Sequence, residues 1–290
     1  MNWIEEASQV IGVPLRRHGT QRAVGPCPYC EQAHGDGGDD RFVVFPEGNY
    51  WCNQCHQKGW WIEEPPTADV VKKRLQDKAE QTQAAYLAMH DNKDWIAYNN
   101  AVKAEIWADR GINQDSIDQW GLGFCESAPY TDPPAPSITI PIFYGQKLYD
   151  IRHRVLGGAK SQKYRSHLSG IVPIFFNLDN LCAGKQVYLV EGEIKAIYLM
   201  QLGIGPIIAY PGVQYINYLP ALAKRHKAKG IEFIAIPDPG TTSHVTKYLE
   251  PVAELGNLCS VVELIDKPDD FTAEYGLVCM KDAIRFRRKL

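Results

Sequence analysis

The sequence of 290 residues has no apolar run that approaches the roughly 18 residues needed for a membrane-spanning helix. Its first ten residues, MNWIEEASQV, contain two acids where a signal peptide would carry bases, so we expect a cytoplasmic protein with no membrane partner. Internal repeats and low-complexity segments are lacking, and the formal net charge of −3 shows no global excess of positive charge. What remains is a globular chain long enough for two domains of about 100–200 residues each.

Positive charge is nevertheless concentrated in two short stretches. Between Tyr144 and His167 there are six lysines or arginines against one acid, and the last ten residues, KDAIRFRRKL, contain five against one. Residues 1–64, by contrast, contain nine acids and five bases. Because clustered bases suit phosphate binding, this asymmetry predicts one or two basic surfaces on a protein that is acidic as a whole.

Composition divides the chain into three parts. Residues 1–64 are rich in cysteine, glycine and aromatic residues, and residues 65–124 have the apolar spacing of helices, with Asn113 as an N-cap and Gly121 ending the short helix QDSIDQW. Residues 125–290 alternate strand-like segments such as QVYLVEG and IEFIAIPDPG with helical ones such as EIKAIYLMQLG. This order predicts an α/β fold, α+β over the whole chain, whose parallel sheet binds ligands at the carboxyl ends of its strands.

Four cysteines, Cys27, Cys30, Cys52 and Cys55, form two Cys-x-x-Cys pairs, with 21 residues between Cys30 and Cys52. Each pair turns both thiolates to one side, and two pairs complete the tetrahedron that zinc prefers. In the segment between them, RFVVFPEGNYWC, the character of the residues alternates on both sides of a Pro-Glu-Gly-Asn turn, as it does in a β-hairpin. The spacing predicts a zinc ribbon whose metal is structural, because four thiolates leave no open position for a reacting water.

Other residues near the cysteine pairs have less certain roles. His34 and His56 are alternative zinc ligands, although His56 directly follows Cys55 and is too cramped to share its metal easily. Four aromatic residues follow the same hairpin: Tyr50, Trp51, Trp60 and Trp61. They are candidates for stacking on unpaired bases or, alternatively, for covering the small core of the ribbon.

The segment DIRHRVLGGAKSQKYRSH, residues 150–167, is the more specific of the two basic stretches. Arg152 and Arg154 share one face of a strand, where they can grip adjacent phosphates. Lys163, Tyr164 and Arg165 combine charge with an aromatic ring, which suits single-stranded nucleic acid. A solvated hairpin without a ligand is the alternative.

Taken in order, the ribbon, IWADRGINQDSIDQWGLGF, the basic strands ending in KYRSH, VEGEIKA and FIAIPDPG resemble the bacterial and phage DNA primases, which join a zinc ribbon to a Toprim catalytic domain. The resemblance covers nearly the whole chain. It implies a nucleotidyltransferase of phage or mobile-element type that copies single-stranded DNA into short RNA primers for DNA replication. Its partners would be the DNA template, ribonucleoside triphosphates and a replicative helicase.

The resemblance also implies roles for the acids that follow the strands. Glu191 matches the family's catalytic glutamate, and Asp238 matches the first aspartate of its Asp-x-Asp metal motif. Asp269 and Asp270 match a third acidic stretch. Magnesium or manganese would bind at these four carboxylates, because nucleotide joining needs a hard cation on the triphosphate. Glu191, Asp238 and Asp269 are therefore the candidate catalytic residues.

Three positions depart from the family's pattern. Lys195 stands where the family has an aspartate, Gly240 replaces the second aspartate of Asp-x-Asp, and Lys267 replaces an acid before a proline. In one interpretation the remaining acids, Glu193 included, bind one metal while Lys195 contacts a phosphate. In the other, the lysines pair with the acids and the site is inactive. The alternative functions are a non-catalytic module that binds single-stranded DNA and recruits a helicase or polymerase, and a Toprim nuclease.

Overall fold

The computed structural model describes residues 2–18, 22–30, 41–52, 55, 57–131, 133–157, 163–168, 173–183 and 186–290. The chain forms two compact units, Met1–Asp77 and Lys78–Leu290. Their boundary falls inside the long helix α2 (Ala68–Met89). The division into three parts at residues 64 and 124 remains a prediction.

The first unit contains an antiparallel sheet, helix α1 (Trp3–Ile11) and the beginning of α2. Its five strands pair in chain order: β1 (Arg16–Arg17), β2 (Ala23–Gly25), β3 (Phe42–Val44), β4 (Asn49–Cys52) and β5 (Lys58–Trp60). β3 and β4 form the predicted hairpin, in which the Gly48 N–H donates to the Phe45 carbonyl at 3.1 Å. Helix α1 begins at a capping box formed by Asn2 and Glu5.

The second unit begins with helices and an antiparallel sheet. After α2 come α3 (Asp94–Asn100), α4 (Ala104–Ala108) and α5 (Gln114–Trp120). Asn113 caps α5 as predicted, accepting a hydrogen bond from the Ser116 N–H at 2.9 Å, and Gly121 ends it with a φ of 60°. The four strands of the sheet are β6 (Gly123–Cys125), β7 (Ser137–Tyr144), β8 (Lys147–Val155) and β9 (Tyr164–Ser166).

A second sheet of five strands contains the predicted parallel arrangement. Its order is β11 (Ile207–Tyr210), β10 (Gln186–Glu191), β12 (Glu232–Ile236), β13 (Leu258–Val261) and β14 (Arg288–Lys289). Adjacent strands among the first four are parallel, whereas β14 pairs antiparallel with β13 at the edge. The α/β fold class predicted from the sequence is therefore confirmed. β7 and β8 stay outside this sheet because the short turn between them makes a hairpin.

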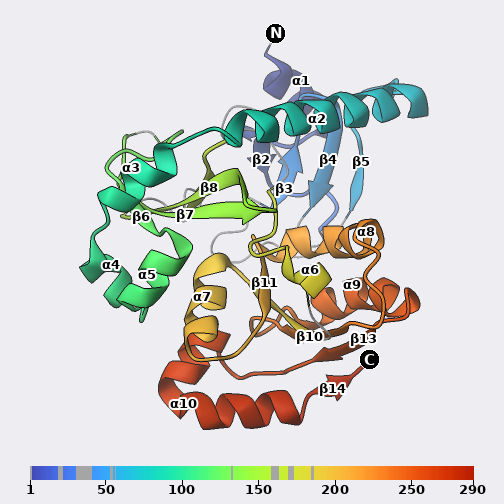
Figure 1. Ribbon diagram of the computed structural model, residues 1–290. Coiled ribbons are helices and arrows are strands. Elements are labelled where there is room, and N and C mark those ends of the chain that lie inside the picture. Colours follow the sequence, from blue (N-terminus) through green and yellow to red (C-terminus); the bar gives the residue numbers. More distant parts are fainter. Residues whose placement is uncertain are drawn as a thin grey trace. The chain divides into compact units, whose positions relative to one another are not determined.

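Helices cover both faces of the parallel sheet. α7 (Glu193–Gln201) and α10 (Pro268–Arg285) pack on one face, and α8 (Leu219–Arg225) and α9 (Thr242–Glu254) pack on the other (Figure 1). Two short elements lie in the connections, α6 (Asn180–Ala183) and the 3-10 helix η3 (Val213–Tyr218). This layered arrangement leaves the carboxyl ends of the parallel strands as the edge where functional side chains gather.

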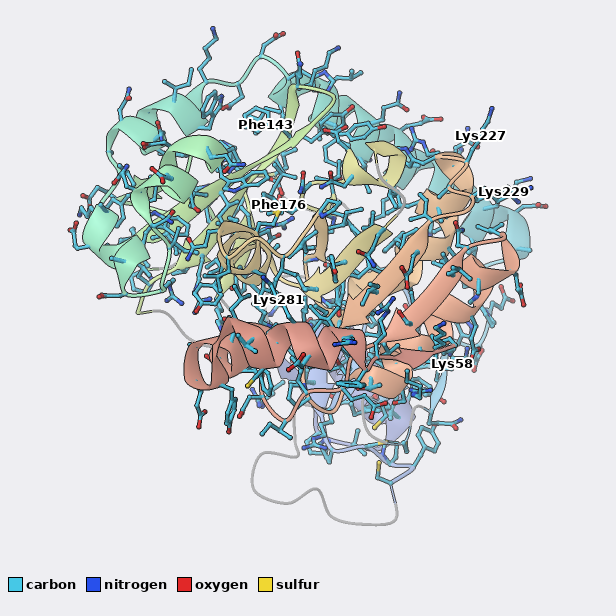
Figure 2. All side chains as sticks on the ribbon, turned by 60° about the horizontal axis from the view of Figure 1, so that its bottom comes forward. Lys58, Phe143, Phe176, Lys227, Lys229 and Lys281 are labelled. Atoms are coloured by element: carbon cyan, nitrogen blue, oxygen red, sulfur yellow. The ribbon has the colours of Figure 1, made fainter. Side chains whose placement is uncertain are left out.

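Neighbouring residues of each parallel strand supply two separate hydrophobic clusters. Val190 packs with α7 and the antiparallel sheet, whereas Leu189 packs with α8 and α9. Phe176 belongs to the first cluster and lies in the interior, while the exposed Lys227 and Lys229 project from the loop after α8 (Figure 2). The first cluster thus joins the two sheets of this unit. No helix in the described part of the chain is both long and apolar enough to cross a bilayer.

The contact between β6 and α3 is tight enough to require a glycine. A Cβ at Gly123 would lie 2.4 Å from the carbonyl carbon of Tyr98 and 2.5 Å from its oxygen. We therefore expect Gly123→Ala to lower the free energy of unfolding by about 1–3 kcal/mol, because backbone must shift to admit the methyl group. Urea denaturation would measure this loss. Ser127→Ala, at an exposed position nearby, is the control, and equal stabilities for the two variants would contradict the close packing.

Candidate functional site

The four predicted cysteines come together in the first unit. The sulfur atoms of Cys27 and Cys55 are 3.7 Å apart, as are those of Cys30 and Cys52, and all four lie within 4.8 Å of one another. Burial raises the pKa of Cys27 and that of Cys30, so a cation that binds thiolates would be needed to deprotonate them. The cluster fits a structural zinc site, as predicted. His34 and His56 lie outside the described residues.

Strand alternation sorts the aromatic residues of the ribbon into two groups. Tyr50 and Trp61 are buried, and Tyr50 packs so closely over Gly59 that a Cβ there would lie 2.4 Å from its hydroxyl oxygen. Trp51 and Trp60 are about two-fifths exposed, at 42% and 41%. Trp51 pairs with Lys58 across the sheet, so both tryptophans and this lysine share one face. The core therefore takes two of the four aromatic residues and leaves two on the surface.

In the second unit, a pocket of about 510 Å³ lies at the carboxyl ends of the parallel strands. Ten of the residues that the sequence singles out line it: Arg154, Lys163, Tyr164, Glu191, Glu193, Lys195, Asp238, Lys267, Asp269 and Asp270. β10 and β12 are adjacent and parallel, which brings the strand end at Glu191 beside the one before Asp238. Residues from both sheets and from helix α10 thus meet in one cavity, although they are far apart in the sequence.

Burial makes the ionised form of two pocket acids costly. It raises the pKa of Glu191, and the nearby charge of Asp238 raises it further, while Lys195 acts in the opposite direction. Burial also raises the pKa of Asp269, and its Oδ1 atom is buried without a hydrogen-bond partner. Carboxylates in this state gain from any cation that enters between them.

Lys195 already supplies a cation at this point. It lies in the first turn of α7, directly after β10, and its amine forms an ion pair with Asp238. The two side chains are only 14% and 17% exposed. The interpretation of an inactive site expects a lysine–acid pair, and the structure contains one. The interpretation in which Lys195 contacts a phosphate requires Lys195 to line the pocket, and it does.

Further positive charges surround the acids. Arg154 donates from Nη1 to the Tyr164 hydroxyl at 2.7 Å, and Lys267 is the N-cap of α10. Lys163 lines the same pocket as Arg154 and Lys267, and its pKa is lowered by burial and then by the charges of these and other bases. The pocket therefore offers a concentrated positive field next to buried carboxylates.

Sequence reasoning missed Arg110, which also lines the pocket. It stands in the turn after α4, where Gly111 has a φ of 70° and packs against Tyr198 of α7. A base directly before a helix-ending glycine is a weak sign of a functional turn. The sequence could not indicate that this turn faces strand ends about 80 residues further on.

Arg152 is placed differently from Arg154, although both point to the same face of β8. Its side chain is 5% exposed, with Nη2 3.5 Å from Asp150 Oδ2 and Nε 3.3 Å from Glu193 Oε1. The expectation that Arg152 grips a phosphate is at odds with this burial, because its charge is already matched by two carboxylates. Glu193 is likewise committed to Arg152 rather than free to bind a metal.

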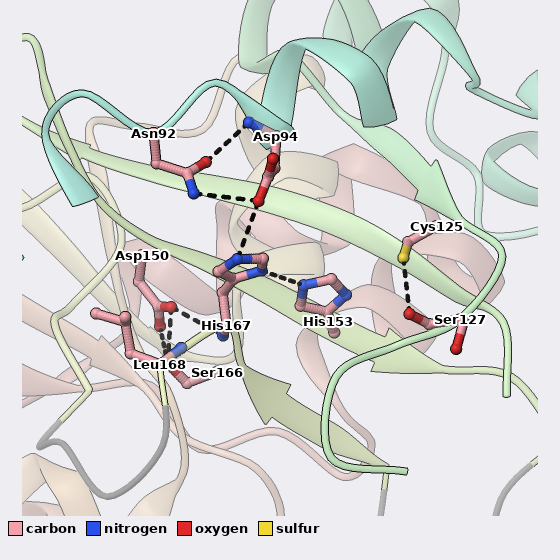
Figure 3. Close-up of polar contacts among 9 residues, drawn as sticks. All are labelled: Asn92, Asp94, Cys125, Ser127, Asp150, His153, Ser166, His167 and Leu168. Atoms are coloured by element: carbon pink, nitrogen blue, oxygen red, sulfur yellow. Dashed lines mark hydrogen bonds and ion pairs between the residues drawn. The ribbon is translucent and has the colours of Figure 1, made fainter. Parts of the chain in front are cut away.

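Strand β9 is held in place by a polar network (Figure 3). The Ser166 hydroxyl contacts both carboxylate oxygens of Asp150 at 2.7 Å, and the His167 N–H donates to Oδ1 at 3.1 Å. His167 also lies 3.2 Å from His153 and 3.2 Å from Asp94 through its two ring nitrogens. Burial lowers the pKa of His153 to about 3, so this ring is neutral near pH 7.

Arg165 does not join the pocket. It alternates with Tyr164 and Ser166 and therefore points to the other face of the sheet, where its Nε is buried without a hydrogen-bond partner. Lys160, which belongs to the same basic stretch, lies outside the described residues. The basic strands thus contribute Arg154, Lys163 and Tyr164 to the pocket.

No family model matches the chain, and no curated protein sequence does. Solved structures do match. The zinc-binding and RNA polymerase domains of the Aquifex aeolicus primase align at a TM-score of 0.53 and 16% identity, covering 100% of this chain and 86% of theirs. The primase fragment of the bacteriophage T7 primase-helicase protein aligns at 0.50 and 13%, covering 93% and 99%. This chain has the primase fold.

A third match agrees with the primase fold. The DnaG primase catalytic domain bound to single-stranded DNA aligns at a TM-score of 0.55 and 18% identity, covering 73% of this chain and 83% of that one. At such low identity the likeness concerns the fold. What the pocket does must be argued from its own residues.

The four-cysteine cluster predicts a specific loss on mutation. Cys52→Ser should release zinc and destabilise the ribbon, because three thiolates and a hydroxyl bind zinc far less tightly than four thiolates. Metal analysis of the purified protein would measure the zinc content, expected to be about one ion per wild-type chain. Cys279→Ser, at an exposed cysteine outside the cluster, is the control. Full zinc retention by Cys52→Ser would contradict the site.

Arg152 and Arg154 should respond differently to the same substitution. Arg152→Met leaves Asp150 and Glu193 buried without a counter-charge and should cost about 3–5 kcal/mol of stability. Arg154→Met removes a partly exposed pocket residue and should cost about 1 kcal/mol or less. Chemical denaturation of both variants tests the difference. Equal losses of stability in the two variants would show that the ion pairs of Arg152 do not stabilise the fold.

Proposed function

We propose that this protein is a DNA primase that synthesises short RNA primers on single-stranded DNA, in the replication of a phage or mobile element. The proposal depends above all on the pocket, where buried carboxylates and a crowd of cations meet at the carboxyl edge of a parallel sheet in the primase fold. A Toprim-type catalytic core would use this edge for nucleotide joining. The substrates would be ribonucleoside triphosphates.

The acids of the pocket would bind one divalent ion. Magnesium is usually held by one or two carboxylates together with phosphates of the substrate, so Glu191 and Asp269 suffice, with Asp270 beside them. The unpartnered Oδ1 atom of Asp269 supports a cation at this position. When bound, magnesium or manganese would neutralise negative charge that develops on the triphosphate.

The bases of the pocket would hold and orient the nucleotide. Arg154, Lys163, Lys267 and Arg110 come from four different segments and can contact several oxygens of one triphosphate. Primer extension joins a 3′-hydroxyl oxygen to the α-phosphorus and releases pyrophosphate. Fixing the two reactants in line would supply much of the rate enhancement, because little covalent chemistry is required of the protein.

The ribbon would bind the template. Trp51 and Trp60 present exposed rings on one face, and Lys58 lies on the same face, opposite Trp51 and two residues before Trp60. Such a face suits unpaired bases next to phosphates. A replicative helicase, which exposes single strands, is the partner we propose for supplying this template.

One observation favours a second function. The ion pair of Lys195 and Asp238 removes one acid from any metal set, as expected of a primase-like module that binds single-stranded DNA and recruits a helicase or polymerase without catalysis. Primer synthesis requires nucleotides and a divalent ion, and such a module requires neither. The two functions are therefore separable by one assay.

Glu191→Gln should reduce primer synthesis by on the order of 100-fold or more, because it removes a charge that the metal and the transition state need. The assay uses mixed single-stranded DNA, labelled ribonucleotides and magnesium or manganese, and detects short labelled RNA. Glu254→Gln, at an exposed acid at the end of α9, is the control. Binding of single-stranded DNA should persist in both variants.

Primer synthesis that is unchanged in Glu191→Gln would contradict the assignment of the pocket. If neither the wild-type protein nor the variant makes RNA but both bind single-stranded DNA tightly, the non-catalytic module is the better description.

A further inference from the structure

The pocket contains a fixed cation at the point where an ion is expected. Lys195 pairs with Asp238, and both are more than four-fifths buried as side chains. A lysine ammonium has three N–H donors and no acceptor, so after one contact with Asp238 it retains donors for phosphate oxygens. Because Lys195 lines the cavity, it lies next to the space that a ligand would occupy.

Asp238 has one neighbouring acid, Glu191, which the proposed function already assigns to the ion shared with Asp269. The chain continues through Pro239 to Gly240, whose φ is 80° and whose missing Cβ faces open space. Among the described residues, the four cysteines of the ribbon are the one group of three or more His, Cys, Asp or Glu side chains close enough to hold one ion. A divalent ion at Asp238 would thus have to displace Lys195 and share Glu191 with the ion of the joining step.

We propose that the Lys195 ammonium replaces a divalent cation at Asp238, so that the pocket binds the triphosphate of a ribonucleotide without a metal ion. The inference rests on the proposed function, since it specifies how the same pocket takes its substrate. The ion at Glu191 and Asp269 then serves the joining step and is not needed for nucleotide binding.

The other cations of the pocket support this arrangement. Arg110, Arg154, Lys163 and Lys267 line it, and none of them forms an ion pair with an acid within the described ranges. Like charges held close together repel one another unless an anion lies between them. A triphosphate has several negative charges and could contact all four bases together with Lys195.

A structural role for Lys195 alone explains less. An ammonium that only neutralises Asp238 accounts for one acid and does not explain why four other bases line the same pocket. A polyphosphate between the bases accounts for the whole set, because its oxygens satisfy the cations that the acids do not reach.

The test measures ATP binding by isothermal titration calorimetry in buffer freed of divalent ions by a resin, which avoids a soluble chelator that would strip zinc from the ribbon. The wild-type protein should bind ATP, and added magnesium should change its Kd by less than about threefold. AMP should bind at least about tenfold more weakly than ATP, because it lacks most of the phosphate charge.

Two variants of Lys195 separate charge from packing. Lys195→Met keeps most of the side-chain length and should weaken ATP binding without magnesium by about tenfold or more. Lys195→Asp should make ATP binding dependent on magnesium or manganese, because it replaces the ammonium beside Asp238 with a further carboxylate. Lys281→Asp makes the same change of charge at an exposed position of α10 and is the matched control (Figure 2).

The outcomes distinguish this inference from the proposed function. ATP binding by the wild-type protein that requires magnesium, with primer synthesis intact, overturns the inference alone. Metal-independent ATP binding without primer synthesis under any condition supports the inference and overturns the function. Unchanged metal-free binding in a folded Lys195→Met variant also overturns the inference.

Discussion

The buried ion pairs of Arg152 are the interaction on which the pocket depends. Arg152 belongs to β8 of the antiparallel sheet, and Glu193 begins α7, which follows β10, an inner strand of the parallel sheet. Through Asp150 the same arginine is linked to Ser166 of β9. One guanidinium therefore fixes the relative positions of the cationic strands and the acidic strand ends. The apolar cluster that the two sheets share supplies most of the energy that holds them together, and the ion pairs set their relative orientation.

Features set by short sequence spacing were predictable. The pairs beginning at Cys27 and Cys52 have their geometry fixed by two intervening residues each, so the zinc site followed from the chain itself. The strand ends at Glu191 and Asp238 were predictable for a similar reason, because apolar parallel strands place their carboxyl ends at one edge. The cap at Asn113 needed only local chemistry.

Features that depend on packing between distant segments were not predictable. Arg152 and Arg154 obey the same alternation along β8, and only the position of α7 buries the first and exposes the second. The partner of Lys195 is 43 residues away, and no pattern near the lysine indicates it. In the ribbon, strand alternation places Tyr50 and Trp51 on opposite faces of β4. Which of these faces is buried could be identified only from the structure, where the ring of Tyr50 packs over Gly59.

The regular pairing of β8 from Asp150 to Val155, and of β9, has a consequence for how this sequence can diverge. Arg154 pairs in register with Tyr164, and Arg152 pairs with Ser166, so all four side chains share a face. Inserting or deleting a single residue within β8 would exchange the two faces of the strand, burying pocket cations and expelling the central ion pair. Homologous chains should therefore tolerate many substitutions in this strand but very few changes in its length, and those only in multiples of two residues.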